Sequence, residues 1–366
     1  MPLTKTYYRA LLALVALALL LPSIASCVLA PAAAHGLAPA PPLPSPTPLP
    51  PIQLPRDEAP HDALSEWWYY TGHLDAADGS HYGFELVIFQ AVRAGYPVGY
   101  AAHFAVTDYE RHSFHYFQRS ASGGSSLALQ GGGKYDLSVG DWSLRGANGD
   151  DHLFAEESGY GLSLAARAEK PPVLQRGTGI ISFGTAGSSY YYSRTRMAAT
   201  GTLTVGGVTK SVTGTAWMDH QWGNFVVGGG GWDWHAYQLD DGSELMISSV
   251  RSAAGDVIPQ ISYATYVDKT GNATSLPIGA VALTATGSWT SPKTGITYPS
   301  GWDVRVEKLG LAIAVRPVIP DQELDVRQST GNVYWEGAVS IDGTKGGAPI
   351  AGRGYVELTG YGVASR

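Results

Sequence analysis

The chain has 366 residues, of which 44% are hydrophobic and 15% are charged, and its 10 Trp and 21 Tyr exclude a disordered protein. The formal net charge is −7 and no cluster of Lys or Arg offsets it, which excludes nucleic acid as a partner. The length suits one large or two medium folded domains.

The first 26 residues have the layout of a bacterial lipoprotein signal peptide. Lys5 and Arg9 precede an apolar run from Ala10 to Leu21, and small residues lead to Cys27. The run is too short to span a bilayer as a permanent helix. We therefore predict cleavage before Cys27, lipidation of Cys27, and a membrane-anchored extracytoplasmic protein. The alternative is an ordinary signal peptide with an incidental cysteine.

Cys27 is the one cysteine of the chain, so its lipidation would leave the mature protein without a thiol. Disulfides, cysteine-ligated zinc and cysteine nucleophiles are then excluded together. Cleavage removes two basic residues and no acid. Lys plus Arg falls from 24 to 22 against 31 Asp plus Glu, and the net charge moves from −7 to −9.

Residues 27–60 are rich in Pro and Ala, which predicts an extended, semi-rigid linker without a core. From His61 onward, alternating or aromatic-rich runs are separated by turn signals such as Asp78-Gly79, and no long segment has helical periodicity. We predict an all-β fold of antiparallel barrels or sandwiches. The expected strands are Glu66–His73, Tyr82–Ala91, Ala101–Asp108, Tyr190–Arg196, Gly201–Val205, Trp232–Leu239, Glu244–Arg251, Ile261–Val267, Ala280–Thr286, Trp302–Val306, Leu311–Val315, Val333–Ile341 and Gly354–Leu358.

A run of four glycines, Gly228–Gly231, coincides with a change in the density of aromatic motifs. We place a boundary there between two β domains, residues 61–228 and residues 229–366. The alternative is one large barrel with an internal glycine loop. Neither a helix pattern nor a Gly-Lys-Ser/Thr motif follows the run, so it is not a phosphate-binding loop.

Four segments combine large aromatic rings with carboxylates and imidazoles: His61–His73, Ser189–Arg194, Gly214–Gly223 with Gly231–His235, and Tyr334–Gly337 with Gly352–Tyr361. On a strand, alternate residues share a face, so Asp219 and Gln221 oppose His220 and Trp222. By the same rule Glu66, Trp68 and Tyr70 share one face, while Trp67 and Tyr69 share the other. Strands of this kind would line an apolar, aromatic pocket with a few polar groups, as small-molecule sites do.

A carboxylic acid in such a pocket has its pKa raised by desolvation, and a neighbouring imidazole can relay a proton. We therefore predict Asp219, His220 and Glu66 as catalytic residues. The predicted substrate-binding residues are Trp222, Trp232, Trp234, His235, Tyr70 and Tyr191. The structural alternatives are aromatic packing across strands, a turn held by Asp219, and a pair between Glu66 and Arg194.

Other chemistries find no support in the sequence. Neither Gly-x-Ser-x-Gly nor His-Glu-x-x-His occurs, and the spacing of His112 and His115 suits a metal site on a helix better than on a strand. We predict no metal and no cofactor. Glycoside hydrolysis by a pair of carboxyl groups remains an alternative. The spacing in the sequence does not show which two of five acids would form the pair: Glu66, Asp219, Asp233, Glu336 and Glu357.

Together the four segments resemble the AttH-like and carotenoid 1,2-hydratase family, a lipocalin-like group described as predicted secreted hydrolases. The string Trp217–Gly223 carries the most specific part of this resemblance, which covers nearly all of the chain from His61 to Tyr361. The resemblance implies two lipocalin-like β-barrel domains packed side by side, with a hydrophobic ligand in or between them. Its members include hydratases of carotenoid double bonds and pericyclic-type cyclases.

Within the resemblance, His220 and Trp222 match the His-x-Trp element of the hydratase branch. That branch also uses an Asp about thirty residues later as a proton donor, whereas Leu245–Val250 contains no carboxylate. Two classes of function follow. The first is an enzyme that hydrolyses or hydrates an apolar molecule with acid assistance. The second is a non-catalytic carrier of a hydrophobic ligand such as a lipid or terpenoid.

Overall fold

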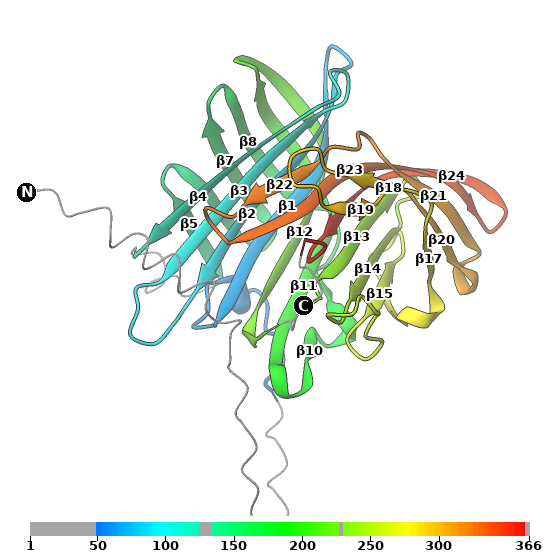
Figure 1. Ribbon diagram of the computed structural model, residues 1–366, viewed down its shortest axis with the longest axis horizontal. Coiled ribbons are helices and arrows are strands. Elements are labelled where there is room, and N and C mark those ends of the chain that lie inside the picture. Colours follow the sequence, from blue (N-terminus) through cyan, green and yellow to red (C-terminus); the bar gives the residue numbers. More distant parts are fainter. Residues whose placement is uncertain (1–48, 124–132, 227–229, 363–366) are drawn as a thin grey trace, which may run out of the picture. The chain divides into compact units, whose positions relative to one another are not determined.

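The computed structural model describes residues 49–123, 133–226 and 230–362, and these residues fold almost entirely into antiparallel β-strands (Figure 1). The prediction of an all-β fold is confirmed. A compact unit begins at Pro51, so it includes the last residues of the predicted linker. The predicted signal peptide, Cys27, Gly228 and Gly229 lie outside the described residues. Within the described ranges, no helix has the length and apolar character needed to cross a membrane.

The first sheet runs in the spatial order β4-β3-β2-β1-β12-β11-β8-β7-β6-β5, with β9 and β10 added on β11. It is a meander in which the first strand pairs with the last, and it curls into a nearly closed barrel. Its strands are β1 (Ser65–Ala76), β2 (His81–Ala91), β3 (Gly99–Asp108), β4 (Ser113–Ser122), β5 (Lys134–Val139), β6 (Trp142–Ala147), β7 (Asp150–Glu157), β8 (Tyr160–Ala168), β9 (Val173–Leu174), β10 (Ile180–Ser182), β11 (Gly187–Val205) and β12 (Val208–Phe225).

The second sheet repeats this plan in the order β16-β15-β14-β13-β24-β23-β21-β20-β17, with β22 added on β23, and forms a half-barrel. Its strands are β13 (Trp232–Leu239), β14 (Glu244–Val250), β15 (Tyr263–Val267), β16 (Ala273–Pro277), β17 (Ala282–Ala285), β20 (Trp302–Val306), β21 (Leu311–Pro317), β22 (Glu323–Val326), β23 (Asn332–Lys345) and β24 (Ala348–Leu358); β18 (Ser288–Thr290) and β19 (Thr297–Pro299) pair separately. The short 3-10 helices are η2 (Arg56–Glu58), η3 (Gln175–Gly177), η4 (Gly184–Ala186), η5 (Ile278–Ala280) and η6 (Glu307–Leu309).

Each sheet encloses its own hydrophobic core. In the first sheet the interior is filled by large rings such as Trp68, Phe84 and Trp142, all fully buried. Trp302 and Trp335 belong to the corresponding core of the second sheet. Strict alternation produces these interiors: in β5, for example, every second residue is buried. The core area buried by these rings is the main source of stability.

A third cluster fills the space between the two sheets, and residues of both contribute to it. Tyr69 and Trp217 come from the first sheet, and Trp234 and Tyr355 from the second. Strands β1 and β2 are therefore buried on both faces, which explains why the run from Trp67 to Tyr70 is aromatic throughout.

Close approach of the sheets depends on Gly83 of β2. A Cβ there would lie 2.5 Å from the hydroxyl oxygen of Tyr355 and 2.8 Å from the Cβ of Ala338. Both distances are far below van der Waals contact, so a side chain at this position would force the two sheets apart. The glycine on the inter-sheet face thus has a packing function.

The sequence predicted no strand between Asp108 and Tyr190, where the structure has β4 to β10. Strands such as β7 bury only every second residue and expose charged side chains between them, so their apolar signal is weak. The two strands predicted at Tyr190–Arg196 and Gly201–Val205 are one continuous strand, β11, whose register shifts between Arg194 and Met197.

Candidate functional site

Strand register gathers carboxyl groups between the two sheets. In the second sheet Glu336 of β23 lies directly opposite Glu357 of β24, and Glu357 lies opposite Trp234 of β13. In the first sheet Asp219 of β12 lies opposite Tyr69 of β1. Residues that face each other across a ladder share one side of the sheet, so these acids and rings meet in the inter-sheet cluster.

Asp219 is the acid of this cluster contributed by β12, and it is only 3% exposed. Its Oδ1 accepts hydrogen bonds from Ser193 Oγ at 2.5 Å and from Trp217 Nε1 at 2.8 Å, and its Oδ2 accepts one from Tyr191 Oη at 2.5 Å. Burial raises the pKa of Asp219 to about 6, although these donors favour the charged form. Asp219 therefore titrates close to neutral pH.

Glu336 and Glu85 form the deepest part of the cluster. Tyr69 Oη donates to Glu336 Oε1 at 2.7 Å across the two sheets, and Tyr334 Oη donates to Glu85 Oε1 at 2.9 Å. Burial raises the pKa of Glu85 to about 8, and burial together with the charge of Glu85 raises the pKa of Glu336 well above its usual range. The second oxygen, Oε2, of each acid is buried and has no hydrogen-bond partner among the described residues.

Glu357 differs from these acids because it is half-buried and lies at the edge of the cluster. Trp232 Nε1 donates to its Oε2 at 2.8 Å, and the Trp232 ring is itself half-buried. Burial, and then the charges of Asp219 and Asp233, raise the pKa of Glu357 to about 7. Glu357 thus combines a proton held near neutral pH with access from outside, which is what a general acid requires.

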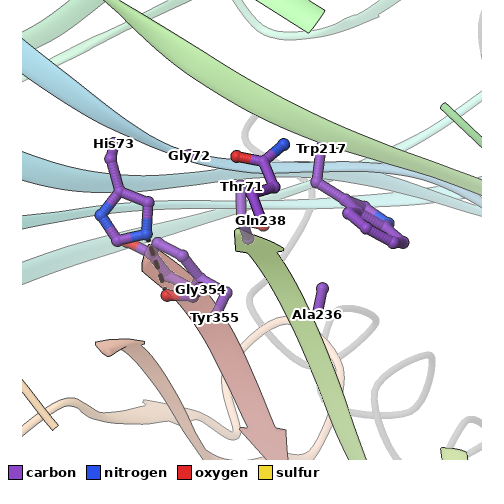
Figure 2. Close-up of a pocket in the computed structure, with 8 residues that line it drawn as sticks. All are labelled: Thr71, Gly72, His73, Trp217, Ala236, Gln238, Gly354 and Tyr355. Atoms are coloured by element: carbon purple, nitrogen blue, oxygen red, sulfur yellow. Dashed lines mark hydrogen bonds between the residues drawn. The ribbon is translucent and has the colours of Figure 1, made fainter. Parts of the chain in front are cut away.

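The inter-sheet cluster has an aromatic edge and a small internal cavity. Partly buried rings of Trp67, Phe89, Phe183 and Trp232 pack against the cluster. The cavity, of about 10 Å³, has room for about one water molecule. Figure 2 shows the residues that line it: Thr71, Gly72, His73, Trp217, Ala236, Gln238, Gly354 and Tyr355.

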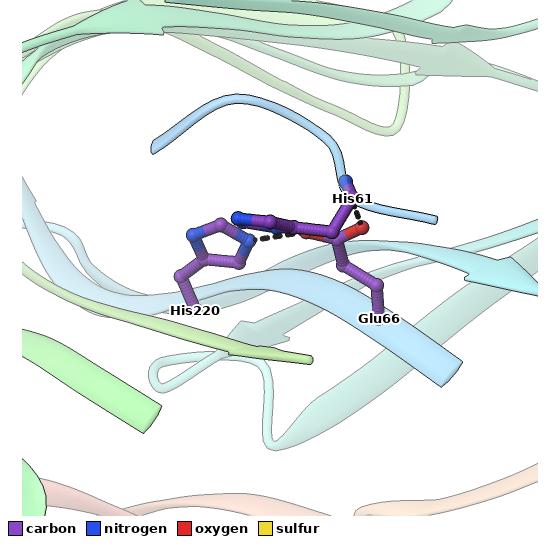
Figure 3. Close-up of side chains that lie close together, drawn as sticks. All are labelled: His61, Glu66 and His220. Atoms are coloured by element: carbon purple, nitrogen blue, oxygen red, sulfur yellow. Dashed lines mark hydrogen bonds and ion pairs between the residues drawn. The ribbon is translucent and has the colours of Figure 1, made fainter. Parts of the chain in front are cut away.

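A second constellation lies on the opposite face of β1 and β12, where His61, Glu66 and His220 converge (Figure 3). Glu66 Oε1 lies 2.7 Å from His61 Nδ1 and 2.8 Å from His220 Nε2. Because an ionised carboxylate only accepts, both imidazoles would donate to Glu66 in this arrangement. The other oxygen, Oε2, accepts from the His61 backbone N–H at 2.8 Å and from Gln90 Nε2 at 3.1 Å.

Aromatic rings hold both imidazoles of this constellation in place. His61 stacks on Trp222 with ring centroids 4.1 Å apart, and His220 stacks on Trp68 at 4.5 Å. Burial lowers the pKa of His220 to about 4, against the opposing effect of Glu66. His220 is therefore neutral at pH 7, with Nδ1 lying 3.4 Å from the Tyr192 hydroxyl.

The structure separates the three residues that the sequence predicted as catalytic. Glu66 and His220 lie together, whereas Asp219 faces the second sheet, because neighbours on a strand point to opposite faces. Trp222 lies beside His220 and not beside Asp219. The proposed pair of Glu66 with Arg194 is wrong: Arg194 pairs with Glu58. Asp219 lies inside β12 rather than in a turn.

The predicted substrate-binding residues are likewise divided among several surroundings. Trp232, Trp234 and Tyr191 belong to the inter-sheet cluster, with Trp234 Nε1 donating to Tyr191 Oη at 3.1 Å. His235 points into the core of the second sheet, where its Nδ1 lies 2.8 Å from Tyr237 Oη. Trp222 and Tyr70 lie in the interior of the first sheet.

Sequence reasoning did not assign roles to Glu85, Glu336, Glu357 or His61. Glu336 and Glu357 do lie in segments that it singled out, and both were among the acids left open as partners. Their pairing depends on the register of β23 with β24, which composition does not specify. His61 is brought to Glu66 by the chain just before β1.

Fold and site together define a protein of two lipocalin-like β-barrel domains with buried acids between them. The chain belongs to the AttH-like family, whose model matches residues 45–361. This confirms the family resemblance drawn from the sequence. None of the curated proteins compared with the chain matches it.

Several solved structures share this architecture. A protein from Nitrosomonas europaea named as an AttH is 32% identical, with a TM-score of 0.77 over 86% of this chain and 98% of that chain. Kievitone hydratase from Nectria haematococca is 18% identical, with a TM-score of 0.68 over 85% and 93% of the two chains. CghA with Sch210972 is 14% identical, with a TM-score of 0.51 over 81% and 89%. At these lower identities the likeness concerns the fold alone.

Proposed function

We propose that the protein is an enzyme that adds water to an apolar substrate held at the aromatic edge of the inter-sheet cluster, with Glu357 as the proton donor. The observation that carries the proposal is a half-buried carboxyl group whose pKa is raised to about 7 beside the indole of Trp232. The shared fold with kievitone hydratase supports the same class of reaction. Acidic groups with shifted pKa values among apolar residues are typical of catalytic sites.

In the proposed reaction, Glu357 transfers its proton to one carbon of a carbon–carbon double bond. The electron pair of that bond forms the new C–H bond and leaves a cation on the other carbon, which the faces of nearby rings such as Trp232 stabilise. Water then attacks the cation, and its surplus proton returns to the Glu357 carboxylate. The sum is the addition of one water molecule, with the enzyme unchanged.

Asp219 and Asp233 have a supporting function in this scheme. Their negative charges raise the proton affinity of Glu357 and so keep it protonated near neutral pH. Asp219→Asn removes one of these charges while the amide oxygen can still accept hydrogen bonds. We expect this variant to shift the alkaline limb of the pH–rate profile to lower pH. Its ligand affinity should stay close to that of the wild type, whereas its melting temperature should fall modestly, because the amide cannot accept all three hydrogen bonds that the buried carboxylate accepts.

The first experiment identifies any apolar molecule that copurifies with the protein, because such a molecule is a candidate substrate. Organic extracts of the native protein are analysed by mass spectrometry, and candidate apolar alkenes from them are incubated with the enzyme in heavy-oxygen water. Hydration gives a single labelled product heavier by one water molecule. Hydrolysis, in which Glu357 would protonate a leaving oxygen instead, gives two fragments.

Glu357→Gln tests the role of the acid directly, since the amide oxygen can still accept from Trp232. We expect turnover to fall on the order of 10²–10⁴-fold while ligand binding persists. Glu307→Gln, on the 3-10 helix η6, removes the same charge away from the cluster and should leave turnover unchanged. A fully active and folded Glu357→Gln protein would remove Glu357 from the mechanism.

The alternative proposal is a non-catalytic carrier of a hydrophobic ligand. It is favoured by the stretch Leu245–Val250, the part of β14 after Glu244, which lacks the carboxylate that the hydratase branch of the family uses. A carrier would release its bound molecule chemically unchanged after prolonged incubation, with no heavy oxygen incorporated.

In either case we propose that Cys27 is lipidated and holds the protein at an extracytoplasmic membrane face.

A further inference from the structure

His61, Glu66 and His220 meet although they come from different segments. His61 precedes β1, Glu66 lies on β1, and His220 lies on the neighbouring strand β12. One ligand-type atom of each residue lies within 4.8 Å of the other two. In the part of the chain that the structure describes, no other three His, Cys, Asp or Glu side chains form such a group.

The surroundings orient these three side chains toward a common point. Glu66 Oε2 is occupied by Gln90 Nε2 and by the His61 backbone N–H, which leaves Oε1 facing both imidazoles. The outer nitrogen of His61, Nε2, lies 4.0 Å from Asp57 Oδ1. The outer nitrogen of His220, Nδ1, lies 3.4 Å from Tyr192 Oη. Metal-bound imidazoles usually donate their outer N–H to a neighbouring oxygen; Tyr192 lies within that range of His220, whereas Asp57 would have to approach His61 more closely.

We propose that His61 Nδ1, Glu66 Oε1 and His220 Nε2 bind a zinc-type divalent cation. Two imidazoles and one carboxylate match a ligand set known for zinc with a fourth, open position, whereas calcium and magnesium prefer oxygen ligands. Zinc with Glu66 and two neutral imidazoles carries a net charge of +1, which favours a deprotonated water or another anion in the fourth position. The site goes beyond the proposed function, because Glu66 and His220 face the interior of the first sheet while Glu357 lies between the sheets.

The distances require only a small adjustment. Ligand atoms about 2.1 Å from a tetrahedral ion are about 3.4 Å apart, against the present 2.7 and 2.8 Å from Glu66 to the two imidazoles. Each imidazole would have to move away from Glu66 by about 0.6–0.7 Å, a shift that side-chain rotation can supply. His61 lies outside the strands, and its side chain is 23% exposed, which gives the ion a path of entry.

In the present arrangement both inner nitrogens donate to Glu66, so a bound ion would take the place of these two protons. Metal binding requires unprotonated His61 Nδ1 and His220 Nε2, so each ring must carry its proton on the outer nitrogen. Tyr192 Oη lies within hydrogen-bond range of the outer nitrogen of His220, whereas Asp57 Oδ1, at 4.0 Å from the outer nitrogen of His61, is an electrostatic neighbour only. In addition, Gln90 Oε1 is buried and has no partner within the described residues, so this polar group beside Glu66 has an unused acceptor.

Such an ion would connect the segment before β1 to strands β1 and β12. That segment already contacts the first sheet, since Trp68 Nε1 donates to the backbone oxygen of Glu58 and Gln90 Nε2 donates to that of His61. A cross-link at His61 would fix the end of the segment at the barrel. The bound cation therefore should raise the melting temperature of the folded protein.

The test uses the protein without an affinity tag, stripped with a chelator and dialysed. Cobalt(II) is added as a spectroscopic probe, and zinc binding is followed by calorimetry and by the melting temperature. We expect one cobalt ion per chain with the visible absorption of a four-coordinate site, and competition by zinc. His61→Gln should weaken binding by about 100-fold or more and abolish the zinc-dependent rise in melting temperature.

His81→Gln provides the matched control, because His81 Nδ1 also lies 2.6 Å from a carboxylate, that of Asp75, whose other partner is Arg353 rather than a second imidazole. It should bind cobalt as the wild type does. Asp57→Asn removes a negative charge 4.0 Å from His61 Nε2 and should weaken binding less than His61→Gln does. Failure of the wild-type chain to bind, or equal binding by His61→Gln, would overturn the proposal. Glu357→Gln should bind normally, which keeps this test independent of catalysis.

Discussion

Glu85 should make the folded protein less stable as the pH rises through neutrality. It is 1% exposed, Tyr334 Oη donates to one of its oxygens, and the other oxygen has no partner among the described residues. Burial raises its pKa from 4.5 to about 8. The folded chain therefore retains a proton on Glu85 at pH values where the unfolded chain has lost it.

The sign follows from proton linkage. Between the unfolded pKa of 4.5 and the folded pKa of about 8, the folded state binds more protons, so the free energy of unfolding falls as the pH rises. The contribution of Glu85 to the free energy of unfolding is fully present below pH 4.5 and is lost as the pH rises through about 8. One group contributes a slope of about 1.4 kcal/mol per pH unit, or on the order of 4 kcal/mol from pH 5 to pH 8.

Glu85→Gln replaces the titrating group with a neutral one of the same shape. We expect a small loss of stability at pH 5, about 1–3 kcal/mol from the altered hydrogen bonding of the buried amide. The variant should then lose less stability than the wild type between pH 5 and pH 8. Urea unfolding at several pH values, followed by tryptophan fluorescence, measures the two slopes.

Glu307→Gln, on the exposed residue that begins η6, controls for the loss of one negative charge. Its slope should follow the wild type. If Glu85→Gln shows the wild-type slope across this range, Glu85 does not hold the extra proton and the account of the buried acids fails. A flatter slope in both variants would point to net charge instead of Glu85.

Two further predictions concern other parts of the chain. Arg194 and Glu58 form an ion pair with side chains only 5% and 2% exposed, so Arg194→Met should leave a buried carboxylate unpaired and lower stability by about 3–5 kcal/mol in urea unfolding. Arg167→Met, in an exposed pair with Asp150, should cost less than about 1 kcal/mol; equal losses would refute the burial argument. Cys27→Ser should move the protein from the membrane fraction to the soluble fraction, and unchanged fractionation would contradict lipid anchoring.

Much of the fold was predictable because strand signals are local. Alternation in β12 correctly placed Asp219 on one face and His220 with Trp222 on the other. The same rule correctly placed Trp68 and Tyr70 on the face toward the core of the first sheet and Trp67 and Tyr69 on the face toward the second sheet. It was not applied to β4 to β10: charged residues weaken the signal of β7, whereas the alternation of β5 is present in the sequence and was overlooked.

The sequence by itself determined the all-β class, the family, and which residue types are available for chemistry. The grouping of those residues was decided by tertiary structure. Asp219 and His220 are neighbours in the chain yet face different surroundings, whereas Glu336 and Glu357 become partners through the register of β23 and β24. Side-chain direction is a local property of a strand, but the pairing of distant strands and the desolvation of an acid arise only when the sheets pack together.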